Sequence, residues 1–105
     1  MIEKSKIEEA IRLLCTEARP RKVILFGSYA GGTADEGSDV DFVVVEDAVD
    51  SVQDETVRLL RVLSPLRIPA DVIVVSAKDF NDWANTPGNV LHEAARFGKV
   101  MYEAA

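Results

Sequence analysis

The sequence predicts one α/β or α+β domain in which a small mixed β-sheet is flanked by helices. Three short apolar runs rich in valine and isoleucine predict buried strands, at Val23–Phe26, Asp39–Glu46 and Asp71–Val75. Segments with apolar residues at helical spacing precede, separate and follow these runs. The chain of 105 residues has the length of one domain and can bury a core without disulfides or a structural metal.

The first predicted element is a helix from about Ser5 to Arg19, where apolar residues recur every three or four positions. Pro20 ends this helix, because a proline disfavours the helical conformation in the residue before it. Val23–Phe26 follows as a buried strand. The glycine-rich stretch Ser28–Ser38 then predicts a loop with about one helical turn before the second strand.

The second half of the chain repeats the alternation of helix and strand. A helical pattern over Asp50–Leu63 ends at Ser64-Pro65, and the third strand begins at Asp71. We then expect two helices and an edge strand, at Ala77–Ala84, Asn89–Phe97 and Val100–Tyr102. Neither a repeat nor a linker divides the sequence, so we expect residues 1–105 to form a single domain.

The net charge and the cysteine content indicate which binding partners and which cellular compartment suit this protein. The net charge of −6 repels phosphate backbones and makes nucleic acid an unfavourable partner. The single cysteine, Cys15, cannot form an internal disulfide, which is typical of a reducing compartment. No stretch approaches the roughly 20 apolar residues that span a bilayer, and the amino terminus lacks the apolar region of a signal peptide. We therefore expect a soluble, cytoplasmic protein with no membrane partner.

The residues with the clearest chemical pattern are Gly27-Ser28 and, after a short loop, Asp39-Val40-Asp41. Alternate residues of a strand face the same side, so Asp39 and Asp41 project together and offer the hard oxygen ligands that Mg²⁺ prefers. Backbone N–H groups after Gly27 and the Ser28 hydroxyl are suited to binding phosphate. An Asp-x-Asp is expected about once by composition alone, so the prediction depends on the arrangement and not on the bare pattern.

The arrangement also predicts how the strands run. Gly27 at the end of the first strand can meet Asp39 at the start of the second only if these strands are antiparallel. A crossover helix and a parallel third strand would then bring Asp71 beside Asp39 and Asp41. Three unpaired carboxylates at one sheet end are costly without a cation, which favours a metal site over a surface loop whose acids cap a strand.

Gly27-Ser28, Asp39-x-Asp41 and the isolated Asp71 resemble the signature of the DNA polymerase β-type nucleotidyltransferase superfamily. The match covers about Val23 to Val75, and the chain length is similar to that of the minimal nucleotidyltransferases (MNT) of HEPN/MNT toxin–antitoxin pairs. The resemblance implies a polymerase β-like fold and a site with two Mg²⁺ ions and ATP as substrate. It implies that Asp39 and Asp41 bind Mg²⁺ and the triphosphate. It also implies that Asp71 helps to hold the second metal and activates the attacking hydroxyl, while Gly27 and Ser28 hold the β,γ-phosphates.

One departure from the family pattern concerns positive charge. Many members carry arginines in the loop, as Gly-Ser-Arg-Ala-Arg-Gly, whereas this chain has Gly27-Ser28-Tyr29-Ala30-Gly31-Gly32. A loop without guanidinium groups attracts phosphate less strongly. Either nucleotide binding is weaker here, or a partner supplies the cation.

The function implied by the resemblance is Mg²⁺-dependent transfer of AMP from ATP to a hydroxyl group. The implied acceptor is a tyrosine of a partner HEPN ribonuclease toxin, for which this chain acts as antitoxin. Two alternatives stay open: a binding module that neutralises its partner by contact alone, and a nucleotidyltransferase that acts on a small molecule or an RNA end. A homodimer stays open as well.

Other reactive or aromatic residues are interpreted as structural. His92, the only histidine, lies in a helical pattern without a serine or cysteine partner, so we expect a surface or half-buried position. Cys15 lies on the apolar stripe of the first helix. Phe80, Trp83 and Phe97 could stack on a base, but hydrophobic packing is the favoured interpretation.

Overall fold

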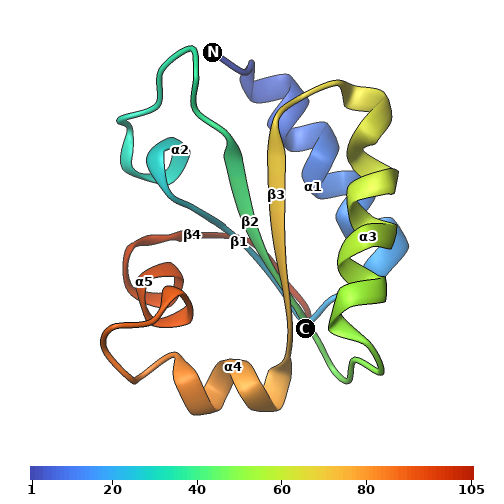
Figure 1. The fold of residues 1–105 in the computed structure, drawn as a ribbon, viewed down its shortest axis with the longest axis vertical. Helices are drawn as coiled ribbons and strands as arrows, with labels where there is room; N and C mark the ends of the chain where they lie inside the picture. The colour runs from blue at the N-terminus through green and yellow to red at the C-terminus, as the bar shows by residue number, and fades with distance from the viewer.

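A computed structural model of residues 1–105 shows a four-stranded mixed sheet with helices on both faces (Figure 1). The strands are β1 (Lys22–Phe26), β2 (Val40–Glu46), β3 (Ala70–Ser76) and β4 (Lys99–Glu103). The α-helices are α1 (Lys4–Ala18), α2 (Ser28–Gly31), α3 (Val52–Leu63), α4 (Ala77–Trp83) and α5 (Val90–Phe97), and a 3₁₀ turn, η1 (Ser64–Leu66), follows α3. The predicted fold class and the order of elements are confirmed.

The strands lie in the order β3-β2-β1-β4. β1 is antiparallel to β2 and to β4, and β2 is parallel to β3, with α3 as the crossover between them. The antiparallel first pair and the parallel second pair are those that the sequence predicted. Asp41 of β2 lies opposite Phe26 of β1 on one side and opposite Asp71 of β3 on the other.

The sheet separates two apolar cores. Side chains of α1 and α3, among them Leu14 and Leu59, pack with Phe42 on one face. Side chains of α4 and α5 pack with Ile24 and Val43 on the other. Successive residues from Phe42 to Val45 enter opposite cores, which is why this part of β2 is a continuous apolar run.

Side-chain caps fix where three helices begin. The Ser51 hydroxyl accepts from the backbone N–H of Asp54, the Ser76 hydroxyl accepts from that of Asp79, and Asn89 caps α5 in the same way. Gly98 ends α5 close against β1, where an added Cβ would lie 2.6 Å from Cγ2 of Ile24. The close approach of α5 to β1 therefore requires glycine at this position.

The observed boundaries differ from the predicted ones at a few positions. The last strand extends over Lys99–Glu103, two residues longer than expected. Its pairing with β1 continues on both sides of a register shift opposite Val23 and Ile24.

No helix of the chain has the length and apolar character needed to cross a membrane.

Candidate active site

The predicted site residues come together at one end of the sheet. Gly27 follows the last residue of β1 and leads into α2, while Asp39 directly precedes β2. Asp41 and Asp71 are the second residues of their strands and are register partners. Both aspartates lie two residues before side chains of the core under α4 and α5, so they face that side of the sheet. In Figure 1, α2 and the start of β3 lie at the same end of the sheet.

Gly27 and Asp41 are in direct proximity, and the backbone of Gly27 explains why. Gly27 has φ +76° and ψ −154°, a region that only glycine adopts readily. A Cβ at this position would lie 2.5 Å from Oδ2 of Asp41, closer than carbon and oxygen can approach. Glycine is therefore required here twice, once for its backbone and once for the space that the carboxylate fills.

The short helix α2 turns the chain directly after this glycine. The carbonyl of Gly27 accepts from the N–H groups of Ala30 and Gly31, each at 3.1 Å. The N–H groups of Ser28 and Tyr29 belong to the first turn and have no partner within the helix. Together with the Ser28 hydroxyl, they are the donors that this end of the sheet offers to an anion.

Tyr29 occupies a loop position where the family pattern has arginine, and it contacts the amino-terminal segment. Its hydroxyl accepts from the backbone N–H of Ile2 at 2.8 Å, and its ring packs on the α1 side of the sheet. The side chain thus anchors the loop to the start of the chain and supplies no positive charge.

The three carboxylates form a site of uncompensated negative charge. Burial raises the pKa of Asp41 above its ordinary value, and the negative charges of Asp71 and Asp39 raise it further. None of the three acids takes part in an ion pair with lysine or arginine. One carboxylate oxygen of Asp71 accepts from the backbone N–H of Val72 at 3.0 Å. The cluster is therefore electrostatically suited to a cation.

The donor set fits Mg²⁺ that is completed by a substrate. No three histidine, cysteine or acidic side chains form a ready-made metal cage anywhere in the chain. Mg²⁺ commonly takes only one or two protein carboxylates and fills its other positions with water and substrate phosphates. Asp39, Asp41 and Asp71 therefore fit a metal that binds together with a nucleotide, and do not fit a permanently caged ion.

The remaining residues singled out from the sequence lie outside this cluster. One ring nitrogen of His92 lies 2.8 Å from the carbonyl of Ala84, and Cys15 is half-buried against the core, as expected for structural residues. Phe80 is buried, which confirms its packing role. The same interpretation is wrong for Trp83 and Phe97, which are 53% and 65% exposed.

Sequence reasoning missed a second acidic group, at the opposite end of β2. Burial and the neighbouring Glu55 raise the pKa of Glu46 to about 7. One Glu46 carboxyl oxygen is buried without a hydrogen-bond partner. Arg58 pairs with Glu55 at 2.7 Å and also donates to the carbonyl of Glu17. An acid directly after the apolar run Phe42–Val45 was the signal that could have identified this group.

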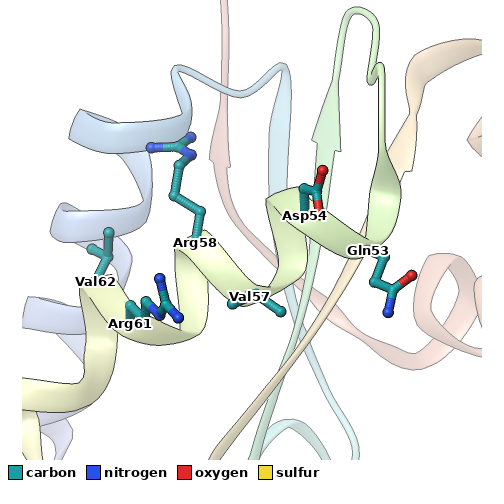
Figure 2. Close-up of a pocket in the computed structure, with 6 residues that line it drawn as sticks. All are labelled: Gln53, Asp54, Val57, Arg58, Arg61 and Val62. Atoms are coloured by element: carbon teal, nitrogen blue, oxygen red, sulfur yellow. The ribbon is translucent and has the colours of Figure 1, made fainter.

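Two hollows of the surface lie apart from the three carboxylates. The hollow in Figure 2 is lined by residues of α3 only: Gln53, Asp54, Val57, Arg58, Arg61 and Val62. A mostly apolar hollow adjoins Gly27 between β1, α2 and α5, and Phe97 lies at it. The acids themselves lie at an open sheet end.

Fold and site together define a nucleotidyltransferase. Residues 7–96 match the family model of the nucleotidyltransferase domain, and the chain belongs to this family. Polymerase β-like topology, a Gly-Ser turn and acids on two adjacent strands agree with this class.

Three known proteins are similar to this chain in sequence or in fold. A Methanocaldococcus jannaschii protein, named as a candidate protein adenylyltransferase, is 37% identical over 107 aligned positions, which cover 97% of this chain and all of that protein. A crystal structure of a toxin–antitoxin with AMP-PNP has a TM-score of 0.69 at 23% identity and covers 98% of this chain and 75% of the matched chain. A candidate nucleotidyltransferase from Sulfolobus solfataricus has a TM-score of 0.51 at 21% identity, over 97% and 90% of the two chains. The two solved structures share the fold with this chain.

Proposed function

We propose that this chain is a Mg²⁺-dependent adenylyltransferase that transfers AMP from ATP to a hydroxyl group of a protein. The observation that carries the proposal is the register of Asp41, which lies beside Gly27 on one side and opposite Asp71 on the other. Phosphate donors and unpaired acids thus meet at one sheet end. The M. jannaschii relative, named as a candidate protein adenylyltransferase, supports a protein as acceptor.

Each residue of the site has a distinct role in this proposal. The N–H groups that follow Gly27 and the hydroxyl of Ser28 hold the β,γ-phosphates. Asp39 and Asp41 would hold Mg²⁺ that binds with the triphosphate, and Asp71 would help to hold a second ion. When bound, two such ions neutralise charge on the attacking and the leaving oxygen. Asp71 accepts the proton of the acceptor hydroxyl, whose oxygen forms a bond to the α-phosphorus while the bond to the departing pyrophosphate breaks.

The proposed partner is a toxin, with a tyrosine of a HEPN ribonuclease as the acceptor. The fold shared with a toxin–antitoxin crystallised with AMP-PNP supports this assignment. The loop of this chain brings no arginine to the phosphates, so a cation from the partner is expected to complete the site. In this proposal residues 1–105 act as one minimal nucleotidyltransferase domain.

The test is transfer of label from α-labelled ATP with Mg²⁺ to the purified product of the neighbouring gene. We expect wild type to label the partner and Asp41→Asn to lose labelling. Asp82→Asn is the matched control, because Asp82 is an exposed aspartate that pairs with Lys78 on α4, away from the site. Equal labelling by wild type and Asp41→Asn would show that the proposed site is wrong.

A second candidate function is neutralisation of the partner by contact alone. The replacement of the loop arginine by Tyr29, which is bound to Ile2, favours it, since this loop attracts phosphate less strongly. It predicts that Asp39→Asn and Asp41→Asn still neutralise the partner fully. Loss of neutralisation in both variants, with the complex still forming, would reject contact alone.

A further inference from the structure

Phe97 is an exposed aromatic side chain that packs with neither core of the molecule. It is the last residue of α5 and is 65% exposed. The helix packs against the sheet through Leu91 and Ala94 instead. Val90, which is also exposed, lies seven residues before Phe97 and therefore on the same side of the helix. Two large apolar side chains on one side of α5 are thus left outside the cores.

Both side chains line the mostly apolar hollow that adjoins Gly27. Phe26 and Gly27 border this hollow at the end of β1, and Gly31 borders it on α2. Its volume is about 330 Å³, at the small end of the range of about 300–1,000 Å³ for ligand pockets. Glu93 is the only charged residue in its lining. Apolar walls and a negative charge disfavour phosphate and suit a flat, uncharged ring system.

The direction of the proposed transfer determines where the nucleoside can lie. In an in-line displacement the attacking oxygen, the α-phosphorus and the leaving oxygen lie roughly on one line. With the acceptor hydroxyl at Asp71 and the β,γ-phosphates at Gly27, this line runs along the sheet end from β3 across β2 to β1. The nucleoside is a further substituent of the α-phosphate and therefore projects to one side of the line, toward one face of the sheet.

The two faces of the sheet differ at this end. Asp41 and Asp71 face the side of α4 and α5, which is opposite the side covered by α1 and α3 (Figure 1). On the α1 side, the ring of Tyr29 packs against the core and its hydroxyl binds the backbone N–H of Ile2. The α5 side is therefore the side open to the nucleoside. Because Gly27 belongs both to the phosphate turn and to the hollow, the two sites are continuous.

The ring of Phe97 is suited to stacking on a base. An aromatic side chain stacks on any base, because every base has a flat π-face. The Cζ atom of Arg96 lies over one face of the Phe97 ring, 5.6 Å from its centre, and Arg96 takes part in no ion pair. This cation–π contact also brings a positive charge close to the hollow, in a chain whose phosphate loop lacks arginine.

We propose that the hollow between β1, α2 and α5 binds the base of the nucleotide, which stacks on the ring of Phe97. The inference rests on the proposed adenylyltransferase function and deepens it. It assigns the phosphates to the turn after Gly27 and the base to the hollow beside this turn. A base in this position covers the two apolar side chains that α5 leaves outside the cores.

The test compares ATP with inorganic tripolyphosphate, which carries the phosphates without a nucleoside. Titration calorimetry with Mg²⁺ measures both affinities, with and without the purified product of the neighbouring gene. Phe97→Ala should weaken ATP binding about 5- to 150-fold, the range for loss of one base–aromatic contact, and leave tripolyphosphate binding unchanged. Phe97→Tyr should bind ATP like wild type. Trp83→Ala is the matched control, because Trp83 is an exposed aromatic at the end of α4 that does not line the hollow.

Three results of this titration would overturn the base site. Unchanged ATP affinity in Phe97→Ala would remove it and leave the transfer function intact. Equal weakening of ATP and tripolyphosphate would make Phe97 a support of the phosphate turn. Weaker binding of the partner protein by Phe97→Ala, at unchanged ATP affinity, would assign the hollow to a side chain of the partner.

Fluorescence provides a second readout. Phe97→Trp in a Trp83→Phe background makes position 97 the only tryptophan of the chain. Bound ATP should change its emission and bound tripolyphosphate should not, whereas no change with bound ATP would overturn the proposal. ATP binding that depends on Phe97, without AMP transfer to any protein, would reject the proposed function and keep the base site. Absence of ATP binding by wild type, with and without the partner, would reject both.

Discussion

Replacing Gly27 with alanine tests the geometry of the site, because this residue touches Asp41. Alanine at φ +76° and ψ −154° is strained by about 1–3 kcal/mol. Each kcal/mol lowers the Tm of a domain of this size by about 4–8 °C. The new Cβ would lie 2.5 Å from Oδ2 of Asp41, so the carboxylate must withdraw by about 0.9 Å to reach an ordinary contact of 3.4 Å. A displacement near 1 Å reduces catalysis by about 100-fold.

Thermal unfolding and transfer of labelled AMP measure the two effects separately. Gly32→Ala is the matched control, because Gly32 has the same φ of +76° but no atom within 4 Å of an added Cβ. This control should lose stability and keep transfer activity. In an Asp41→Ala background the contact disappears, so Gly27→Ala should cost less stability than in wild type. Wild-type transfer by Gly27→Ala would refute the contact as a determinant of the site.

Three further predictions concern charge and packing. Asp41→Asn should raise the Tm at pH 7, because the raised pKa of Asp41 means that its charge destabilises the fold, and should lower AMP transfer by about 100-fold or more. The free energy of unfolding of wild type should fall as pH rises from 4.5 to about 7, because in this range Glu46 keeps its proton in the folded chain and releases it in the unfolded chain. Melting curves at pH 5 and pH 8 should show this decline for wild type, and Glu46→Gln should remove it. Gly98→Ala should cost about 1–3 kcal/mol in denaturant unfolding, because its Cβ would meet Ile24 and the carbonyl of Ala94; an unchanged midpoint would contradict this packing.

The strands and the acids of the site could be predicted from the sequence because they depend on local pattern and simple topology. Runs such as Phe42–Val45 are apolar on every residue, which a central strand with two covered faces requires. The meeting of Asp41 with Asp71 follows once the strand directions are known, and the observed register agrees.

Other features depend on distances that no local pattern contains. The contact between Tyr29 and Ile2 joins positions 27 residues apart, and the approach of Gly27 to Asp41 needs both backbone angles of the glycine. The raised pKa of Glu46 arises from burial against α3, which the sequence shows only as an acid after a strand. Phe97 is exposed although it is apolar. The reason is that α5 packs against the sheet through other residues, Leu91 and Ala94.

The pairing of the last strand with the first has a consequence for the order in which the protein can form during synthesis. β1 becomes an internal strand only when Lys99–Glu103 has emerged to pair with it. Until then, a nascent chain holds β1 as an open edge next to Gly27. A ribosome-bound chain with residues 1–76 exposed therefore contains every residue of the candidate site but lacks the strand that completes the support of the turn at Gly27. Native-like resistance of β1 to protease should appear late in translation, after Asp39, Asp41 and Asp71 have already left the ribosome.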